Sequence, residues 1–378
     1  MKNVVIAGYA RSPFHFAHKG DLTKVRPDDL AAQVVRGLIE RTGVNPEDIE
    51  DIIVGCSFPE GEQGFNVAKL IGFLADLPIS VAGTTVNRFC GSSMQSVHMA
   101  AGAIQLDAGD AFICAGIESM TRVPMGGYNP MPSPALMEKY PQAYMSMGIT
   151  AENVARQYQI TREDQQAFAM TSHAKAAEAQ QKGRLKDEIV PIKSNGHVVE
   201  QDGCIRPGTD QNSLSGLKPA FDVNGTVTAG TSSPLTDGAA ACLICTEDYA
   251  MKRGLDVIAR FKSAAVAGCK AEFMGIGPVG ASKKALARAG LEIGDIDVVE
   301  LNEAFASQAL ASMQDLGMDQ AKVNLDGGAI ALGHPLGATG ARITGKAASV
   351  MKREGGKYAI ATQCIGGGQG IATVLEAV

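Results

Sequence analysis

The most restrictive feature of this sequence is an internal repeat with a spacing of 247 residues. The phrase Gly43-Val-Asn-Pro-Glu-Asp-Ile returns in altered form as Gly290-Leu-Glu-Ile-Gly-Asp-Ile. Two further landmarks keep this offset, so that 290 − 43, 295 − 48 and 356 − 109 all equal 247. Three matches in one register predict that the chain folds as two similar halves.

Each half alternates short apolar runs with stretches of helical periodicity. The expected strands cover residues 2–10, 48–56, 79–86, 107–116, 295–301 and 358–362, and the expected helices cover 27–41, 65–75, 282–289 and 342–352. Strands that alternate with helices are typical of mostly parallel sheets covered by helices. The sequence therefore predicts an α/β fold built twice.

The segment between the halves has a different character. Residues 120–147 are rich in Pro and Met, and Thr161-Arg-Glu-Asp164 resembles a capping box that starts a helix over 162–182. A loop-rich insertion on a rigid scaffold is a natural place for a ligand. The expected domains are a first half over 1–119, completed by about 236–258, an inserted loop domain over 120–235, and a second half over 259–378.

The composition argues against several classes of protein. A net charge of −6 without any Lys/Arg block disfavours nucleic-acid binding. No apolar run is long enough to cross a membrane, and Val4–Ala7 is too short for the core of a signal peptide. Eight cysteines without a disulfide spacing suit a reducing compartment. We therefore expect a cytoplasmic protein with no nucleic-acid partner and no membrane insertion.

Several motif-like patterns are weak. Gly275-Ile-Gly-Pro-Val-Gly280 matches the dinucleotide-binding pattern, but no strand runs directly into its first glycine. Gly340-Ala-Arg-Ile-Thr-Gly-Lys346 lacks the Ser or Thr that a phosphate loop needs after its lysine. His15 and His18 have no further ligand cluster, and Cys242-x-x-Cys245 lies inside an apolar run. We expect no metal site from these residues.

Cys90 lies in Asn87-Arg-Phe-Cys-Gly-Ser-Ser-Met-Gln95, where an expected strand turns into a helix. The amino end of a helix presents free N–H groups and the positive end of the helix dipole, which favour an anion. A thiol in that place is expected to have a stabilised thiolate, which is the nucleophilic form. The alternative interpretation is a buried structural cysteine.

Three later stretches carry polar groups at the carboxyl ends of expected strands, where open α/β sheets bind ligands. They are Asn302-Glu-Ala-Phe305, Gly333-His-Pro-Leu-Gly337 and Cys364-Ile-Gly-Gly-Gly368. By the internal offset, His334 corresponds to Asn87 (334 − 247 = 87), three residues before Cys90. The sequence therefore predicts that matching turns of the two halves present His334 and Cys90 to one site.

With these motifs together, the chain resembles the thiolase family of acyl-CoA C-acetyltransferases from residue 4 onward. The resemblance implies the thiolase fold, in which two βαβαβαββ halves form a five-layered α-β-α-β-α core with an inserted loop domain. In that family a histidine like His334 takes the proton of the nucleophile, here Cys90, and a cysteine like Cys364 moves the proton at the substrate α-carbon. An asparagine like Asn302 positions a water that helps the histidine bind the thioester oxygen. The backbone N–H groups of Cys90 and Gly366 would form a second oxyanion hole.

The resemblance also implies the substrates. Thiolases transfer an acyl group from a 3-ketoacyl-CoA through the cysteine to a second CoA, in a ping-pong reaction that uses CoA as co-substrate and no permanently bound cofactor or metal. The inserted region resembles the family's CoA-binding loop domain. The positions that match its CoA and acyl contacts are Arg206, Ser213, Phe221, Ala229, Ser233, Met147 and Phe305.

Two departures bear on the subtype. Ser146 stands where acetoacetyl-CoA-forming thiolases usually carry His, and Cys90-Gly-Ser-Ser-Met-Gln differs from their C-G-S-G-L-R. Both resemble the degradative 3-ketoacyl-CoA thiolases of fatty-acid β-oxidation. The alternatives are a biosynthetic acetoacetyl-CoA thiolase and, more remotely, a non-catalytic thiolase-like lipid-binding protein, whereas a ketosynthase would lack a cysteine like Cys364. The expected partners are a second copy, as a homodimer or dimer of dimers, and a multifunctional β-oxidation subunit.

Overall fold

The computed structural model describes residues 2–378 and contains a ten-stranded sheet, nine strands of which form one path made of two matching portions. The strands of the N-terminal portion are β1 (Val4–Arg11), β8 (Thr236–Thr246), β5 (Ala111–Ser119), β3 (Asp51–Gly55) and β4 (Ala82–Val86), in that spatial order. β3 is parallel to both β4 and β5, while β8 is antiparallel to β5 and β1. A short strand, β2 (His15–Phe16), also pairs with β8.

The C-terminal portion repeats this order and these directions. Its strands are β9 (Ala259–Gly268), β12 (Gln369–Glu376), β11 (Tyr358–Ile365) and β10 (Val298–Leu301). β10 is parallel to β11, and β12 is antiparallel to both β11 and β9. The two portions meet where β1 pairs with β9 over two residue pairs.

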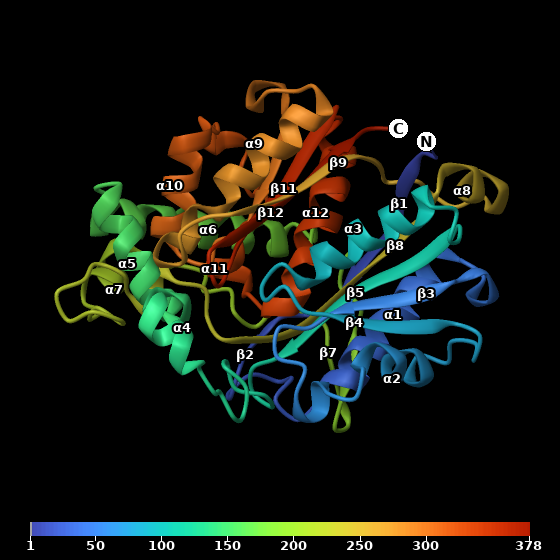
Figure 1. The fold of residues 1–378 in the computed structure, drawn as a ribbon, viewed down its shortest axis with the longest axis horizontal. Coiled ribbons are helices and arrows are strands. Elements are labelled where there is room, and N and C mark those ends of the chain that lie inside the picture. The colour runs from blue at the N-terminus through green and yellow to red at the C-terminus, as the bar shows by residue number, and fades with distance from the viewer. Residues whose placement is uncertain (1) are drawn as a thin grey trace.

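Helices divide the core into five layers (Figure 1). The helices are α1 (Pro27–Thr42) and α2 (Val67–Leu74) outside the N-terminal sheet, α3 (Ser92–Gln105) and α12 (Thr339–Glu354) between the sheets, and α9 (Gly277–Ala289) and α10 (Ala306–Leu316) outside the C-terminal sheet. One apolar core lies under α1 and α2, a second surrounds α3 and α12 and reaches strands of both sheets, and a third lies under α9 and α10. The predicted five-layered fold is confirmed. The expectation of mostly parallel sheets was wrong, because β8, β9 and β12 run antiparallel to each strand that they pair with within residues 2–378.

The internal offset is visible in the elements themselves. α3 and α12 begin at residues 92 and 339, and β5 and β11 begin at 111 and 358, so each pair is separated by 247 residues. Short 3-10 helices at Pro46–Asp48 and Ile293–Asp295 keep the same spacing. The repeat in the sequence is therefore a repeat in the structure.

The segment between β5 and β8 forms an inserted lobe. Its helices α4 (Pro134–Lys139), α5 (Met147–Gln157) and α7 (Gln211–Ser215) lie at the left of Figure 1, and α6 (Arg162–Gln181) lies nearer the centre. The hairpin of β6 (Ile192–Ser194) and β7 (His197–Val199) lies apart from them, at the bottom. The predicted capping box is present, because Thr161 and Asp164 each accept the other's backbone N–H. α8 (Glu247–Arg253) and α11 (Ala329–Leu332) complete the helices.

Some boundaries differ from the sequence prediction. α9 begins at Gly277 rather than near 282, with Pro278 in its first turn, where a missing N–H costs no helical hydrogen bond. A Cβ atom at Gly277 would lie 2.0 Å from the carbonyl oxygen of Gln369. The glycine-rich pattern there allows a helix to approach β12 rather than a phosphate. Within residues 2–378, no helix is both long and apolar enough to span a bilayer.

Candidate functional site

Cys90 is held by a tight turn between β4 and α3. Phe89, directly before it, has a φ of 43°, a left-handed conformation that a bulky residue adopts only when its surroundings enforce it. Asn87 supplies part of that constraint, because its side chain accepts the N–H of Phe89 at 2.8 Å and donates to the carbonyl of Ser57 at 3.0 Å. The carbonyl of Cys90 accepts from the Gln363 side-chain amide.

The thiol of Cys90 is not the stabilised thiolate that its helix-end position suggests. Cys90 keeps some exposed surface toward a cavity, but protein surrounds its other sides, and this burial raises its pKa to about 11. The backbone N–H groups of Gly366 and of Cys90 itself act in the opposite direction, and the Glu118 carboxylate adds to the rise. The expectation of a stabilised Cys90 thiolate was wrong, because desolvation of the thiol outweighs the N–H donors.

His334 lies in the loop between α11 and α12 and is buried. Its Nδ1 is 2.6 Å from Oγ1 of Thr339, and that hydroxyl donates to the carbonyl of Pro335 at 3.2 Å. We therefore assign the proton to Nδ1, which leaves Nε2 as an acceptor. Burial, with a smaller contribution from Arg342, lowers the pKa of His334 to about 3, so the imidazole is neutral near pH 7.

Asn302 follows β10, and its backbone N–H donates to the carbonyl of Thr362 at 3.0 Å. Its Nδ2 lies 3.4 Å from Nε2 of His334. Its Oδ1 is buried and has no hydrogen-bond partner among residues 2–378. A buried amide oxygen has a strong preference for a donor, so this atom can bind a polar ligand group or a water.

Cys364 is fully buried near the end of β11, opposite Gly370 of β12. Burial raises the pKa of its thiol well above the ordinary value, and Cys90 and Cys269 add to the rise. Gly366 follows two residues later, and its backbone N–H lowers the pKa of Cys90, although burial of the thiol outweighs this effect. Gly367 and Gly368 have φ values of 77° and 83°, which glycine adopts without strain.

One mostly apolar cavity of about 180 Å³ brings seven of the twelve sequence-predicted site residues together. They are Cys90, His334, Cys364, Met147, Phe221, Ser233 and Phe305. Five further residues line the same cavity although no sequence motif predicted them as site residues: Met120, Met125, Leu235, Met274 and Leu336. These five are ordinary apolar residues from separate segments, so no local motif distinguishes them from core residues.

The remaining predicted residues lie outside this lining. Asn302 contacts His334, which lines the cavity, and the backbone N–H of Gly366 acts on the Cys90 thiol, which also lines it. Arg206, Ser213 and Ala229 are exposed on the lobe. Ser213 takes part in the capping box of α7, in which its Oγ accepts the backbone N–H of Asp210 at 3.1 Å, and the backbone N–H of Arg206 lies 3.2 Å from Nδ1 of His173. The proposed contacts of these three with CoA stay predictions.

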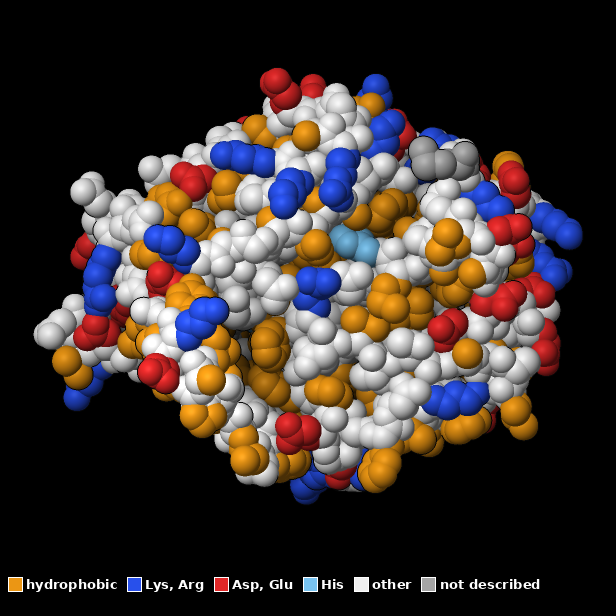
Figure 2. Space-filling model, in the orientation of Figure 1, with side chains coloured by type: hydrophobic (Ala, Val, Ile, Leu, Met, Phe, Trp, Pro, Cys, Tyr) orange, Lys and Arg blue, Asp and Glu red, His pale blue; other side chains and the backbone are white. Residues whose placement is uncertain are grey.

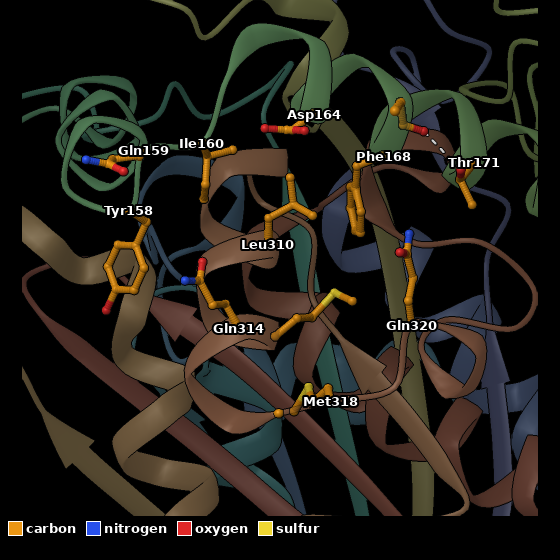
Figure 3. Close-up of a pocket in the computed structure, with 13 residues that line it drawn as sticks. Tyr158, Gln159, Ile160, Asp164, Phe168, Thr171, Leu310, Gln314, Met318 and Gln320 are labelled. Carbon is orange, nitrogen blue, oxygen red and sulfur yellow. Dashed lines mark hydrogen bonds between the residues drawn. The ribbon is translucent and has the colours of Figure 1, made fainter.

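A larger groove of about 690 Å³ lies between α6 and the ends of α5 and α10 (Figure 3). Tyr158, Phe168 and Met318 are among the side chains that line it. It contains none of the predicted catalytic residues, so size alone does not identify the site. The smaller cavity combines an apolar wall with two thiols and an imidazole, which is the composition that acyl transfer through a cysteine requires.

The chain is similar to known proteins over its full length. Residues 4–248 match the family model "Thiolase, N-terminal domain", and residues 255–377 match "Thiolase, C-terminal domain". A 3-ketoacyl-CoA thiolase of Bacillus subtilis is 49% identical over 389 residues, covering 100% of both chains, and one of Marinobacter nauticus is 49% identical over 388 residues, covering 100% of this chain and 99% of the other. A crystal structure of human mitochondrial 3-ketoacyl-CoA thiolase in complex with CoA superposes with a TM-score of 0.93 at 35% identity, covering 100% and 98% of the two chains.

Proposed function

The chain belongs to the thiolase family, and from this membership we propose that it is an acyltransferase that cleaves 3-ketoacyl-CoA with CoA. The products are acetyl-CoA and an acyl-CoA shortened by two carbons. The observation that carries the proposal is that Cys90, His334 and Cys364, which come from three separate segments, line one apolar cavity. Full-length relatives named 3-ketoacyl-CoA thiolase support the same substrate class.

The first step moves the thiol proton of Cys90 to Nε2 of His334. With a Cys90 pKa of about 11 and a His334 pKa of about 3, both groups are neutral at rest, and a free thiolate–imidazolium pair is unfavourable. We therefore propose that proton transfer accompanies attack of sulfur on the ketone carbon. The thiolate charge then passes into the new bond and onto the substrate oxygen as it forms.

The second step breaks the bond between the α-carbon and the ketone carbon. The acyl group stays on Cys90, and acetyl-CoA departs as an enolate that takes a proton from Cys364 at its α-carbon. A second CoA thiol then gives its proton to Cys364 and attacks the acyl group. Cys90 leaves as a thiolate and recovers its proton from His334, so both thiols and the imidazole end as they began.

Two sets of donors support the oxygens that become negative. The backbone N–H groups of Cys90 and Gly366 favour negative charge at the Cys90 sulfur, and we propose that they also stabilise an oxygen on the acylated carbon. For the thioester oxygen we propose His334 and a water held by the unpartnered Oδ1 of Asn302. Fixed donors at these oxygens lower the barrier because they need no rearrangement during reaction.

We further propose that CoA lies along the lobe. Exposed Arg206 would lie near the adenine end of CoA, with Ser213 and Phe221 close by. Ala229 and Ser233 would contact the pantetheine arm. Met147 and Phe305 would form walls of the acyl pocket, where the rings of Phe305 and Phe221 meet edge to face with centroids 5.8 Å apart. The human relative solved in complex with CoA supports CoA as the co-substrate. We propose no permanently bound cofactor.

The degradative direction is the subtype that we favour, in fatty-acid β-oxidation and in the cytoplasm. Ser146 lines the cavity, and Met120, Met125 and Met274 supply flexible walls that suit an alkyl chain. The test is to incubate the purified protein with CoA and a 3-ketoacyl-CoA and to quantify acetyl-CoA, with Cys90→Ala as the inactive control. Equal acetyl-CoA formation by Cys90→Ala would reject the proposal.

We also propose that a second copy pairs with β4. β4 is the last strand of its sheet, and no strand within residues 2–378 covers its outer edge. Phe65, Ile79 and Leu106 are exposed nearby, and Figure 2 shows apolar side chains gathered over α3 and β4. An open edge with apolar neighbours is a template for association. Light scattering should detect a homodimer or a dimer of dimers.

A multifunctional β-oxidation subunit is a further proposed partner, and co-purification tests whether it binds this chain.

A further inference from the structure

Glu118 is a fully buried carboxylate near the end of β5 that the mechanism above does not use. Each of its oxygens accepts two N–H bonds. Oε2 accepts from the backbone of Ser57 at 2.8 Å and of Gly337 at 2.9 Å, and Oε1 accepts from the backbone of Phe58 at 3.2 Å and the side chain of Gln63 at 3.0 Å. The Cys56 thiol also faces this carboxylate, with its Sγ 3.8 Å from Oε1. Burial raises the pKa of Glu118, whereas the N–H donors from Ser57, Gly337 and Gln63 act in the opposite direction. Four N–H groups directed at two oxygens suit an ionised carboxylate.

One side of this carboxylate leads to the turn that carries Cys90. Ser57, whose N–H binds Glu118, accepts the side-chain amide of Asn87 through its carbonyl at 3.0 Å. Asn87 in turn holds the N–H of Phe89. The ring of Phe58 lies 6.0 Å from that of Phe89, centroid to centroid. The loop of Ser57 and Phe58, which Glu118 binds, therefore contacts both Asn87 and Phe89 in the strained turn before Cys90.

The other side leads to His334. Gly337 lies between His334 and Thr339, whose hydroxyl is the hydrogen-bond partner of the imidazole. A Cβ atom at Gly337 would lie 2.7 Å from the carbonyl oxygen of Ile117 and 2.9 Å from Oε2 of Glu118, so this loop packs directly on β5. The hydrogen bond from Gly337 to Glu118 is therefore the point where the His334 loop is fastened to the N-terminal half.

We propose that Glu118 is a positioning residue that aligns the Cys90 turn with the His334 loop across the boundary between the two halves. The proposal rests on the proposed function, because alignment matters only if His334 accepts the Cys90 proton. The carboxylate also bears on the nucleophile electrostatically. Its charge disfavours the Cys90 thiolate, while Gly366, His334 and Cys364 are the other groups that face the thiol.

Two substitutions separate alignment from charge. Glu118→Gln keeps the shape but removes the charge and turns a donor toward the N–H groups, while Glu118→Asp keeps the charge but shortens the side chain by one methylene. In both variants we expect kcat for thiolysis to fall about 100-fold, as a misplacement of about 1 Å can cause, with KM for CoA within threefold of wild type. The pH midpoint of Cys90 alkylation by iodoacetamide should shift to lower pH in Glu118→Gln only.

The matched control is Glu188→Gln, which removes another buried carboxylate, here one that pairs with Arg11 and Lys346. This control should lower the melting temperature without changing kcat or the alkylation midpoint. Wild-type kcat in soluble Glu118→Asp, or equal losses of kcat in Glu118→Gln and Glu188→Gln, would overturn the positioning role. Alkylation needs no substrate, so an unchanged midpoint in Glu118→Gln refutes the link to Cys90 even if wild-type thiolysis is absent. A shifted midpoint without any wild-type thiolysis would instead refute the proposed function alone.

Discussion

Nδ2 of Asn302 lies 3.4 Å from Nε2 of His334, and this contact joins the end of β10 to the loop before α12. Thr339 holds the opposite nitrogen of the same ring at 2.6 Å. The imidazole is therefore oriented from both sides, and the amide donor favours the tautomer in which Nε2 is free of a proton. The atom that we propose as the base is thus prepared to accept one before any substrate binds.

This orientation can be tested through Thr339. Thr339→Val removes the oxygen that accepts from Nδ1, so the imidazole loses its fixed tautomer, and Thr339→Ser restores it. We expect Thr339→Val to lower kcat by about tenfold to 100-fold, part of the roughly 10²–10⁴-fold that a general base contributes, and His334→Ala to lose the whole of it. Steady-state thiolysis measures both, and full activity of Thr339→Val would contradict the assignment of the proton to Nδ1.

Cys364 is expected to act on a different step from Cys90. Its thiol is fully buried and its pKa lies well above the ordinary value, so it can hold a proton for the enolate. Cys364→Ala should strongly slow exchange of the acetyl-CoA α-protons with D₂O, measured by mass spectrometry, and leave partial transfer of a preformed acyl group to CoA. Equal loss of both half-reactions in Cys364→Ala and Cys90→Ala would contradict separate roles.

The fold could be predicted from the sequence because its halves repeat. The 247-residue offset relates α3 to α12 and β5 to β11 as corresponding elements of the two halves, and the apolar runs indicated where strands lie. α10 was not predicted, because its polar residues Ser307, Gln308 and Ser312 are buried together with its alanines, so that polarity does not mark an exposed face.

The site was predicted as far as its residues lie in motifs. Glu118 was missed because its partners Ser57 and Gly337 are 61 and 219 residues away and donate through their backbones, which leave no mark on side-chain identity. The direction of the Cys90 pKa shift was wrong for a related reason. A helix end is readable from the sequence, but the desolvation that outweighs it depends on how distant segments pack around the thiol.

His334 should make the protein sensitive to acid. In the unfolded chain an imidazole takes up a proton near pH 6.5, whereas in the folded protein His334 stays neutral until about pH 3. Its contribution to the free energy of unfolding is therefore fully present above pH 6.5 and is lost as the pH falls from 6.5 towards about 3. Between pH 7 and pH 5, His334→Gln should lose less stability in urea unfolding than wild type.

The control for that measurement is His197→Gln, which replaces an exposed histidine on β7. It should lose as much stability as wild type between the same two pH values. A His334→Gln variant that loses as much as this control would contradict a neutral, buried His334. Burial also lowers the pKa of His98 to about 3 and the pKa of His173 to about 4. Part of the acid sensitivity should therefore persist in the His334→Gln variant.

Chain length should depend on position 146. Ser146 is a small residue in the wall of the cavity, and Met125 and Leu235 at the same cavity are partly exposed, which leaves room for an alkyl chain. About three extra buried methylenes at roughly 0.8 kcal/mol each should favour six-to-ten-carbon 3-ketoacyl-CoAs over acetoacetyl-CoA in kcat/KM. Ser146→His should reduce this preference. A wild-type maximum at four carbons would favour the biosynthetic alternative instead.

The most direct test of the mechanism is to identify the residue that carries the acyl group. Wild-type protein is mixed briefly with acetyl-CoA, quenched in acid, digested and analysed by peptide mass spectrometry, with Cys90→Ala and Cys364→Ala treated in parallel. We expect an acetyl group on Cys90 in wild type and in Cys364→Ala, and no acylated peptide in Cys90→Ala. Acetyl label on Cys364 with Cys90 unmodified would contradict Cys90 as the nucleophile.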